Sequence, residues 1–226
     1  MNNVLQHGIK TALTIGLIIG VTACDDESAI DKVVDKMDKK YSTEISYINA
    51  VNASTTFYAK SNLYTRGVYD SDFKVVNLLE NKVSRKIDHK WSSHGHKFEF
   101  AIKDTNSGAR TADVKYNVQN KGKYWAIAWM DNNSDVLSIF EMKPSNQNDV
   151  FRVRVFANTA LSVKILGSDA DFTETIAGEV SETYTINNCA DLYVGGNEID
   201  LCQQGDFGQS YLVVVDSQGL ITYGKE

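Results

Sequence analysis

Residues 98–103 read Phe-Glu-Phe-Ala-Ile-Lys, with a large apolar side chain at every second position. This alternation predicts a β-strand that buries one face and exposes the other. It recurs in the segments 114–118, 151–155 and 163–165. Residues 211–215, Tyr-Leu-Val-Val-Val, form a continuous apolar run that is typical of a strand covered on both faces. We therefore predict an all-β body built from half-buried antiparallel strands.

The most polar stretch of this body, residues 143–149, contains the single proline of the chain. It separates residues 44–142 from residues 150–226, and these two segments have similar patterns. Each opens with a strand and a corner of small polar residues. The pattern predicts two tandem antiparallel β-sandwich modules, 44–142 and 150–226, joined by the linker 143–149.

The closing parts of the two segments also match. Gly122 is followed after two residues by Trp125 and an apolar run, and Gly208 is followed after two residues by Tyr211 and an apolar run. On this basis the sequence pairs Trp125 with Tyr211 as equivalent positions of a repeat.

The opening strands resemble a family of uncharacterised β-sandwich repeats found in exported bacterial proteins. The resemblance lies in the stretches that begin at Ile45 and at Val153, each a strand followed by a small polar corner. The proline-rich corner and Val-Tyr-Val strand typical of that family are missing here. The resemblance implies a β-sandwich architecture and no particular activity.

The composition indicates a globular protein, with 42% hydrophobic, 23% charged and 10% aromatic residues. The 23 basic and 29 acidic residues give a net charge of −6, which argues against binding of nucleic acid over the whole surface. We expect no nucleic-acid partner.

The first residues have the pattern of a signal peptide. Lys10 is followed by an uncharged run, residues 11–23, that is too short for an ordinary transmembrane helix. The run ends in Val21-Thr22-Ala23-Cys24, which resembles the lipobox of bacterial lipoproteins. The resemblance implies that residues 1–23 are removed and that Cys24 receives diacylglycerol, which anchors the protein on a membrane.

Asp25 follows the cysteine directly, as in lipoproteins of the enterobacterial type that stay in the inner membrane. The sequence therefore favours the periplasmic face of the inner membrane, with the outer membrane as the alternative. Residues 24–43 are expected to form an acylated stalk. Within it, residues 28–40 have charges between apolar residues at helical spacing, which fits a short helix or a flexible spacer.

Cys189 and Cys202 are the other cysteines, an even pair in an oxidising compartment. The turn signal Gly195-Gly196 lies between them, and neither a Cys-x-x-Cys spacing nor a basic neighbour suggests a catalytic thiol. We predict a structural disulfide.

Asp88, His89, His94 and His96 fall within nine residues. On a strand His94 and His96 would point the same way and could chelate zinc or copper, with His89 or Asp88 as a third ligand. A solvated hairpin explains the same residues, because Ser and Gly between them favour a turn and the flanking lysines repel a cation.

The same region is basic, and charge is divided unevenly along the chain. Basic residues around Trp91 could touch anionic headgroups or an acidic envelope polymer, or could simply be solvated on a strand pair: Lys82, Arg85, Lys86, Lys90 and Lys97. Residues 44–142 carry 13 basic and 11 acidic residues (net +2), and residues 150–226 carry 4 and 11 (net −7). The second module could attract a basic envelope protein, or its charge could serve solubility alone.

Asp169, Asp171 and Glu174 could begin a calcium site but lack the remaining features of an EF-hand loop. None of the common catalytic motifs occurs, so we expect no enzyme and no cofactor. The leading hypothesis is a membrane-anchored periplasmic lipoprotein that acts as a non-catalytic binding or assembly module. A hydrolase of envelope glycan or peptide and a metal-binding lipoprotein are the alternatives.

Overall fold

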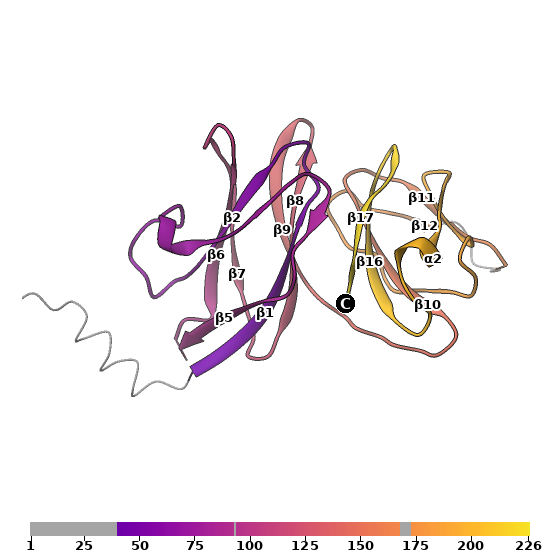
Figure 1. The fold of residues 1–226 in the computed structure, drawn as a ribbon, viewed down its shortest axis with the longest axis horizontal. Coiled ribbons are helices and arrows are strands. Elements are labelled where there is room, and N and C mark those ends of the chain that lie inside the picture. The colour runs from indigo at the N-terminus through magenta and orange to yellow at the C-terminus, as the bar shows by residue number, and fades with distance from the viewer. Residues whose placement is uncertain (1–39, 93, 168–172) are drawn as a thin grey trace, which may run out of the picture. The chain divides into compact units, whose positions relative to one another are not determined.

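The computed structural model describes residues 40–92, 94–167 and 173–226, and these residues form an all-β protein (Figure 1). Within these ranges the helical elements are the 3₁₀ turn η1 (Ser71–Phe73) and the short helix α2 (Leu201–Gln204). The all-β prediction is confirmed. The predicted signal peptide, Cys24, Asp25 and residues 28–39 of the stalk lie outside the described residues.

The first half, up to residue 142, consists of two sheets. One has the order β4-β1-β8-β9, with β5 also pairing with β1, and the other has the order β3-β2-β6-β7 (Figure 1). β1 begins within the range 24–43 that the sequence assigned to the stalk. The strands are β1 (Lys40–Asn49), β2 (Thr55–Ser61), β3 (Lys74–Leu78), β4 (Lys82–Val83), β5 (Ile87–Ser92), β6 (Lys97–Asp104), β7 (Arg110–Asn117), β8 (Lys123–Asp131) and β9 (Ser134–Glu141).

The second half repeats this strand order. Its sheets are β13-β10-β16-β17 and β12-β11-β14-β15, which correspond position by position to β5-β1-β8-β9 and β3-β2-β6-β7. The strands are β10 (Phe151–Ala157), β11 (Ser162–Ile165), β12 (Thr173–Glu174), β13 (Tyr184–Ile186), β14 (Leu192–Val194), β15 (Asn197–Ile199), β16 (Ser210–Asp216) and β17 (Gly219–Lys225).

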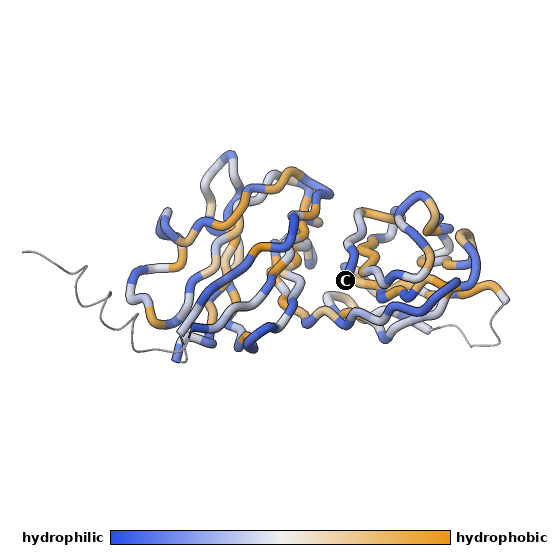
Figure 2. The backbone as a smooth tube through the Cα atoms, turned by 60° about the horizontal axis from the view of Figure 1, so that its bottom comes forward, coloured by the Kyte–Doolittle hydropathy of each residue, from blue (hydrophilic) through white to orange (hydrophobic). Residues whose placement is uncertain are grey.

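Each half has its own core, formed by the apolar side chains at every second position of its strands. In β6 the side chains of Phe98, Phe100 and Ile102 enter the first core, and in β10 Phe151 and Val153 enter the second. Hydrophobic and hydrophilic residues follow one another closely along the strands in Figure 2. The period of two that predicted the strands is the direct result of this one-sided burial.

Two strand pairs differ from the antiparallel arrangement predicted from the sequence. β1 pairs with β8 in parallel, and β10 pairs with β16 in parallel. Parallel pairing requires a long connection, and in each half most of the remaining strands lie between the two partners. Alternation within a strand shows which face is buried, but it does not show whether the neighbouring strand runs parallel or antiparallel. The parallel pairing could therefore not be predicted from the sequence.

A tyrosine near the start of each of these central strands supports the preceding turn. The backbone N–H of Gln119 donates to Tyr124 Oη at 2.9 Å, and the N–H of Asp206 donates to Tyr211 Oη at 2.8 Å. In the parallel registers Tyr124 lies opposite Ile45 and Tyr211 opposite Val153. The structure therefore makes Tyr124 the counterpart of Tyr211, and the sequence pairing with Trp125 is wrong by one residue.

A third apolar cluster joins the two halves. Trp125, Ile127 and Trp129 of β8 pack in one buried cluster with Phe156 of β10 and Leu212 of β16. The described residues of both halves also fall within one compact unit. Each half therefore covers a large apolar face of the other. The division into two independent modules, 44–142 and 150–226 with the linker 143–149, stays a prediction.

A buried ion pair lies beside this cluster. Arg154 and Glu226 are only 4% and 7% exposed, and the guanidinium binds the carboxylate through Nε, at 3.0 Å from Oε2, and through Nη2. From the first half, Trp125 Nε1 donates to Glu226 Oε1 at 3.2 Å, and the carbonyl of Glu141 accepts from Arg154 Nη2 at 2.9 Å. The pair thus connects β10 to β8 and β9.

We predict that Glu226→Gln lowers the free energy of unfolding by about 3 kcal/mol, because it leaves the buried Arg154 guanidinium without a counter-charge. Urea denaturation of the purified chain measures this loss. The control Lys225→Gln changes an exposed neighbour and should cost less than about 0.5 kcal/mol. The double variant Arg154→Met/Glu226→Leu should recover most of the lost stability. Equal stabilities of Glu226→Gln and Lys225→Gln would contradict the assigned role.

Candidate functional site

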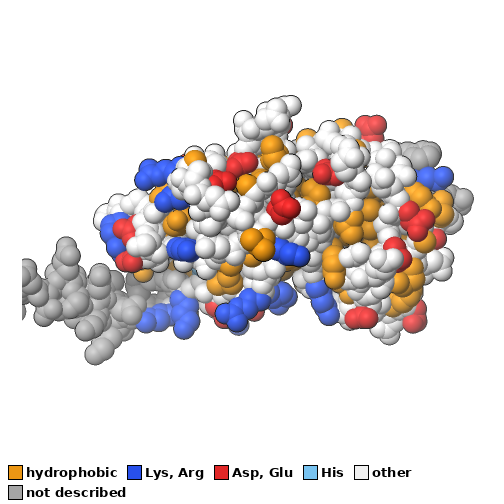
Figure 3. Space-filling model, turned by 45° about the horizontal axis from the view of Figure 1, so that its top comes forward, with side chains coloured by type: hydrophobic (Ala, Val, Ile, Leu, Met, Phe, Trp, Pro, Cys, Tyr) orange, Lys and Arg blue, Asp and Glu red, His pale blue; other side chains and the backbone are white. Residues whose placement is uncertain are grey.

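The five basic residues singled out from the sequence are all exposed: Lys82, Arg85, Lys86, Lys90 and Lys97. In Figure 3 the Lys and Arg side chains lie mainly over the first half, the left part of Figure 1. Trp91, which the sequence placed among them, is half-buried against the first core and stacks near Tyr41, with ring centroids 4.8 Å apart. Its main role is packing.

The structure does not gather these five side chains at one place. Lys82 lies opposite Asn49 at the far end of β1, whereas Lys90 lies opposite Ser42 near its beginning. Asn49 and Ser42 are seven positions apart along β1, which at ~3.3 Å per residue is roughly 23 Å. That distance exceeds a Debye length of ~8–10 Å, so Lys82 and Lys90 lie too far apart to reinforce each other's charge.

A depression of about 340 Å³ on the outer face of β2, β6 and β7 concentrates positive charge instead. Its lining is Lys60, Asn62, Lys97, Phe98, Glu99 and Lys115. Lys60, Glu99 and Lys115 lie side by side across the three strands, in the registers Lys60–Glu99 and Glu99–Lys115. Three lysines and one glutamate give the lining a formal charge of +2.

Lys60 is held in place at this depression. Its Nζ lies 3.0 Å from Glu99 Oε2 and donates to the carbonyl of Arg66 at 2.9 Å, and its side chain is only 10% exposed. Lys97 and Lys115 are exposed. Lys97 stands out in the sequence as part of a basic stretch, but Lys60 and Lys115 do not. Alternation places both on an outward face without showing which strands become neighbours.

The three histidines proposed as metal ligands are not brought together. His89 points into the first half, where its Nε2 lies 2.9 Å from Tyr47 Oη and its ring packs near Phe98. His94 and His96 are exposed beyond the end of β5. Among the residues that the structure describes, no group of three or more His, Cys, Asp or Glu side chains is placed to hold a metal ion.

Burial lowers the pKa of His89 to about 4, against a smaller opposing effect of the Asp88 carboxylate. The folded protein therefore keeps this imidazole neutral at a pH where the unfolded chain, with an ordinary pKa near 6.5, already binds a proton. Protonation of the unfolded state then favours unfolding as the pH falls.

We predict that His89 removes up to about 3 kcal/mol of stability between pH 6.5 and pH 4, at about 1.4 kcal/mol per unit of pKa difference. Denaturant unfolding at a series of pH values measures this slope. His89→Gln should flatten it, and the exposed control His96→Gln should leave it unchanged. The same slope in wild type and His89→Gln would show that other groups cause it.

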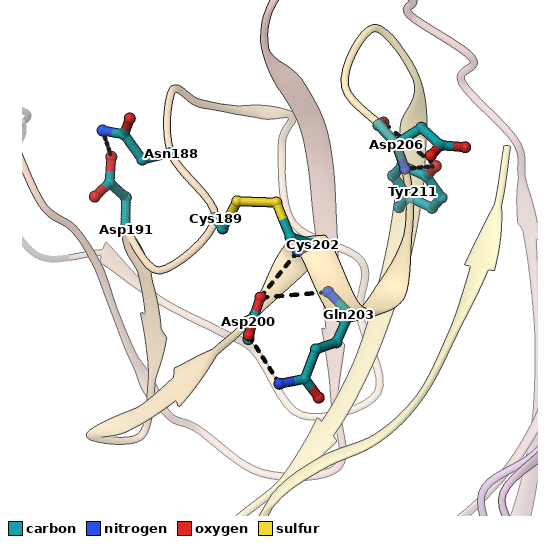
Figure 4. The surroundings of a disulfide bond; sticks show 8 residues. All are labelled: Asn188, Cys189, Asp191, Asp200, Cys202, Gln203, Asp206 and Tyr211. Carbon is teal, nitrogen blue, oxygen red and sulfur yellow. Dashed lines mark hydrogen bonds between the residues drawn. A yellow bond between two sulfur atoms is a disulfide. The ribbon is translucent and has the colours of Figure 1, made fainter.

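The predicted disulfide is present. Cys189 and Cys202 are bridged, with their Cα atoms 5.1 Å apart, and Figure 4 shows the bond between the loop before β14 and the helix α2. Asp200 caps this helix by accepting from the N–H groups of Cys202 and Gln203 at 3.0 and 3.3 Å. The bridge closes a loop that contains the β14–β15 hairpin, and such a bridge is worth ~3 kcal/mol in the chain-entropy model.

Part of the acidic charge of the second half has a structural use. Besides Asp200 as a helix cap, Asp191 accepts from Asn188 at 2.8 Å, and Asp216 accepts from the N–H of Gln218 at 2.8 Å. Glu174, in contrast, is exposed on β12. Its predicted partners in a calcium loop, Asp169 and Asp171, lie outside the described residues.

None of the helices in the described part of the chain is long and apolar enough to cross a membrane. Comparison with models of known protein families and with curated proteins finds no match to this chain.

Proposed function

We propose that this protein is a membrane-anchored lipoprotein of the bacterial cell envelope that acts as a non-catalytic binding or assembly protein. The observation that carries the proposal is the apolar run ending in Val21-Thr22-Ala23-Cys24. The disulfide between Cys189 and Cys202 supports it, because stable disulfides belong to oxidising, exported compartments. Asp25 favours the periplasmic face of the inner membrane over the outer membrane.

The uneven charge supports a division of tasks within the anchored protein. The first half, net +2, follows the anchor directly and would be attracted to an anionic bilayer. The second half, net −7, would be repelled from the same surface and could bind a basic envelope partner. Because an apolar cluster joins the halves, both tasks are to be tested in the whole chain and not in separate fragments.

We predict that Cys24→Ser prevents acylation and either releases the protein from membranes or traps the uncleaved precursor. Cell fractionation and mass spectrometry of the N-terminus measure both outcomes. Cys202→Ser, which breaks only the disulfide, should stay in the membrane fraction. An unmodified N-terminus downstream of Cys24 in membrane-bound protein would contradict the proposal.

We further predict that Glu174→Lys/Glu179→Lys/Glu182→Lys weakens cross-linking to a partner at least about tenfold, because these exposed carboxylates contribute to the acidic field. The measurement is quantitative cross-linking of the anchored protein in its own membranes. Glu80→Lys/Asp88→Lys/Asp113→Lys makes the same charge change at exposed positions of the first half and should leave the partner bound. Equal loss with both variants would contradict the role of the second half.

A further inference from the structure

We propose that one end of the first half docks on an anionic phospholipid surface, with headgroup phosphates in the depression and two exposed side chains in the interfacial layer. This docking end consists of Lys60, Leu63, Tyr64, Lys97 and Lys115. The inference deepens the proposed function, since it specifies which residues of the anchored protein contact the bilayer.

Three contacts bring the elements of the docking end together. The hydroxyl of Ser61, the last residue of β2, donates to the carbonyl of Gly95 at 3.0 Å. The N–H of Asn62 donates to the carbonyl of Lys97 at 2.8 Å. Lys40, the first residue of β1, lies opposite Ser92, the last residue of β5. The loop after β2, the start of β6 and the start of β1 therefore meet at one end of the first half.

β1, the first described strand after the predicted anchor, also begins at this end. Cys24 precedes Lys40 by sixteen residues, a length that could span at most ~55 Å when extended. A tether of that length brings the first half to the membrane without deciding which surface faces it. A separate set of contacts has to determine the orientation.

The depression has the charge and the donors that a phosphate requires. Its lining carries a formal +2, and the side chains of Lys97 and Lys115 are exposed at its rim. An ammonium group has three N–H donors, and Glu99 and the Arg66 carbonyl account for two of those of Lys60. In the proposed docking, the third N–H donor of Lys60 binds a phosphate oxygen.

The loop beside the depression exposes two large side chains that are neighbours in sequence. Leu63 is 49% exposed and Tyr64 is 54% exposed. Tyr64 is positioned by packing on Phe73, with ring centroids 5.3 Å apart. Tyrosine is enriched at membrane–water interfaces, where its ring lies at headgroup level. An apolar pair next to lysines fits the interfacial layer of an anionic bilayer better than it fits water.

The charge contribution is tested with the chain from Asp25 onward, which lacks Cys24 and keeps the compact unit that contains all described residues. It should float with vesicles of equal phosphatidylglycerol and phosphatidylcholine at low salt, and not with phosphatidylcholine alone. Lys97→Glu/Lys115→Glu should lower the apparent affinity at least about 30-fold, because the loss of two lysines at ~1 kcal/mol each gives that factor and the new carboxylates add repulsion. The matched control Lys82→Glu/Arg85→Glu makes the same charge change away from the docking end, because Lys82 lies opposite Asn49, and the N–H of Ser84, next to Arg85, donates to the carbonyl of Tyr47. It should lower the affinity less than about threefold.

The insertion of the loop is tested with an environment-sensitive probe on Leu63→Cys. Its fluorescence should shift to the blue on the anionic vesicles and be quenched by doxyl-labelled lipids. Leu79→Cys is the matched control, because Leu79 is also an exposed leucine, at 65%, and its neighbour Leu78 contacts Asn49 at the far end of β1. The probe at this position should stay in water.

Each contrary result overturns the docking proposal. Equal loss of affinity in the two charge variants would mean that only the overall charge acts. A probe on Leu63→Cys that stays in water would exclude insertion. Binding of soluble glycerophosphoglycerol without binding of vesicles would assign the depression to a free phosphodiester. Because the chain in these experiments lacks Cys24, failure here leaves the anchoring experiment unaffected, and failure of acylation leaves this test unaffected.

Discussion

The packing of β8 between two cores is the constraint on which the rest of the structure depends. Along this strand Tyr124 and Ala126 enter the core of the first half, while Trp125 and Ile127 enter the cluster shared with the second half. In the second half, β16 likewise divides its side chains between its own core and the shared cluster. A fully buried large side chain contributes ~1.5–3 kcal/mol, so separating the halves would expose several such contributions at once. The second half therefore stabilises the first by covering one of its apolar faces.

The shared cluster also explains features that look unrelated along the chain. Gly224 of β17 leaves room for the ring of Trp125, and Gly178, with φ of +75°, leaves room for the ring of Trp129. A side chain at either position would collide with an indole. The ion pair of Arg154 with Glu226 sits beside the same rings and needs partners of fixed geometry, so the apolar packing and the buried charges specify one arrangement together.

The sequence was sufficient for features that depend on one strand or one residue pair. Alternation identified the strands, and the apolar run 211–215 was identified as buried on both faces. The even number of cysteines after Cys24 identified the pair Cys189 and Cys202. Features that depend on which strands become neighbours were missed. The parallel pairing of β1 with β8, the burial of Glu226 and the meeting of Lys60 with Lys115 all join residues that are distant in sequence, and periodicity carries no information on such contacts.

The basic residues show how this limit changes a functional interpretation. Between Lys82 and Lys90 the charges look like one site because the residues are close in sequence, yet β4 and β5 run along β1 and distribute them over its length. A planar membrane attracts charges strongly only within a Debye length, so an elongated row of lysines contributes little unless the strand lies flat on the surface. The end of the first half, in contrast, places charges from three strands beside two exposed apolar side chains. Such an end can approach a surface with all its groups at once, which is why we propose it as the membrane contact although it contains fewer of the basic residues.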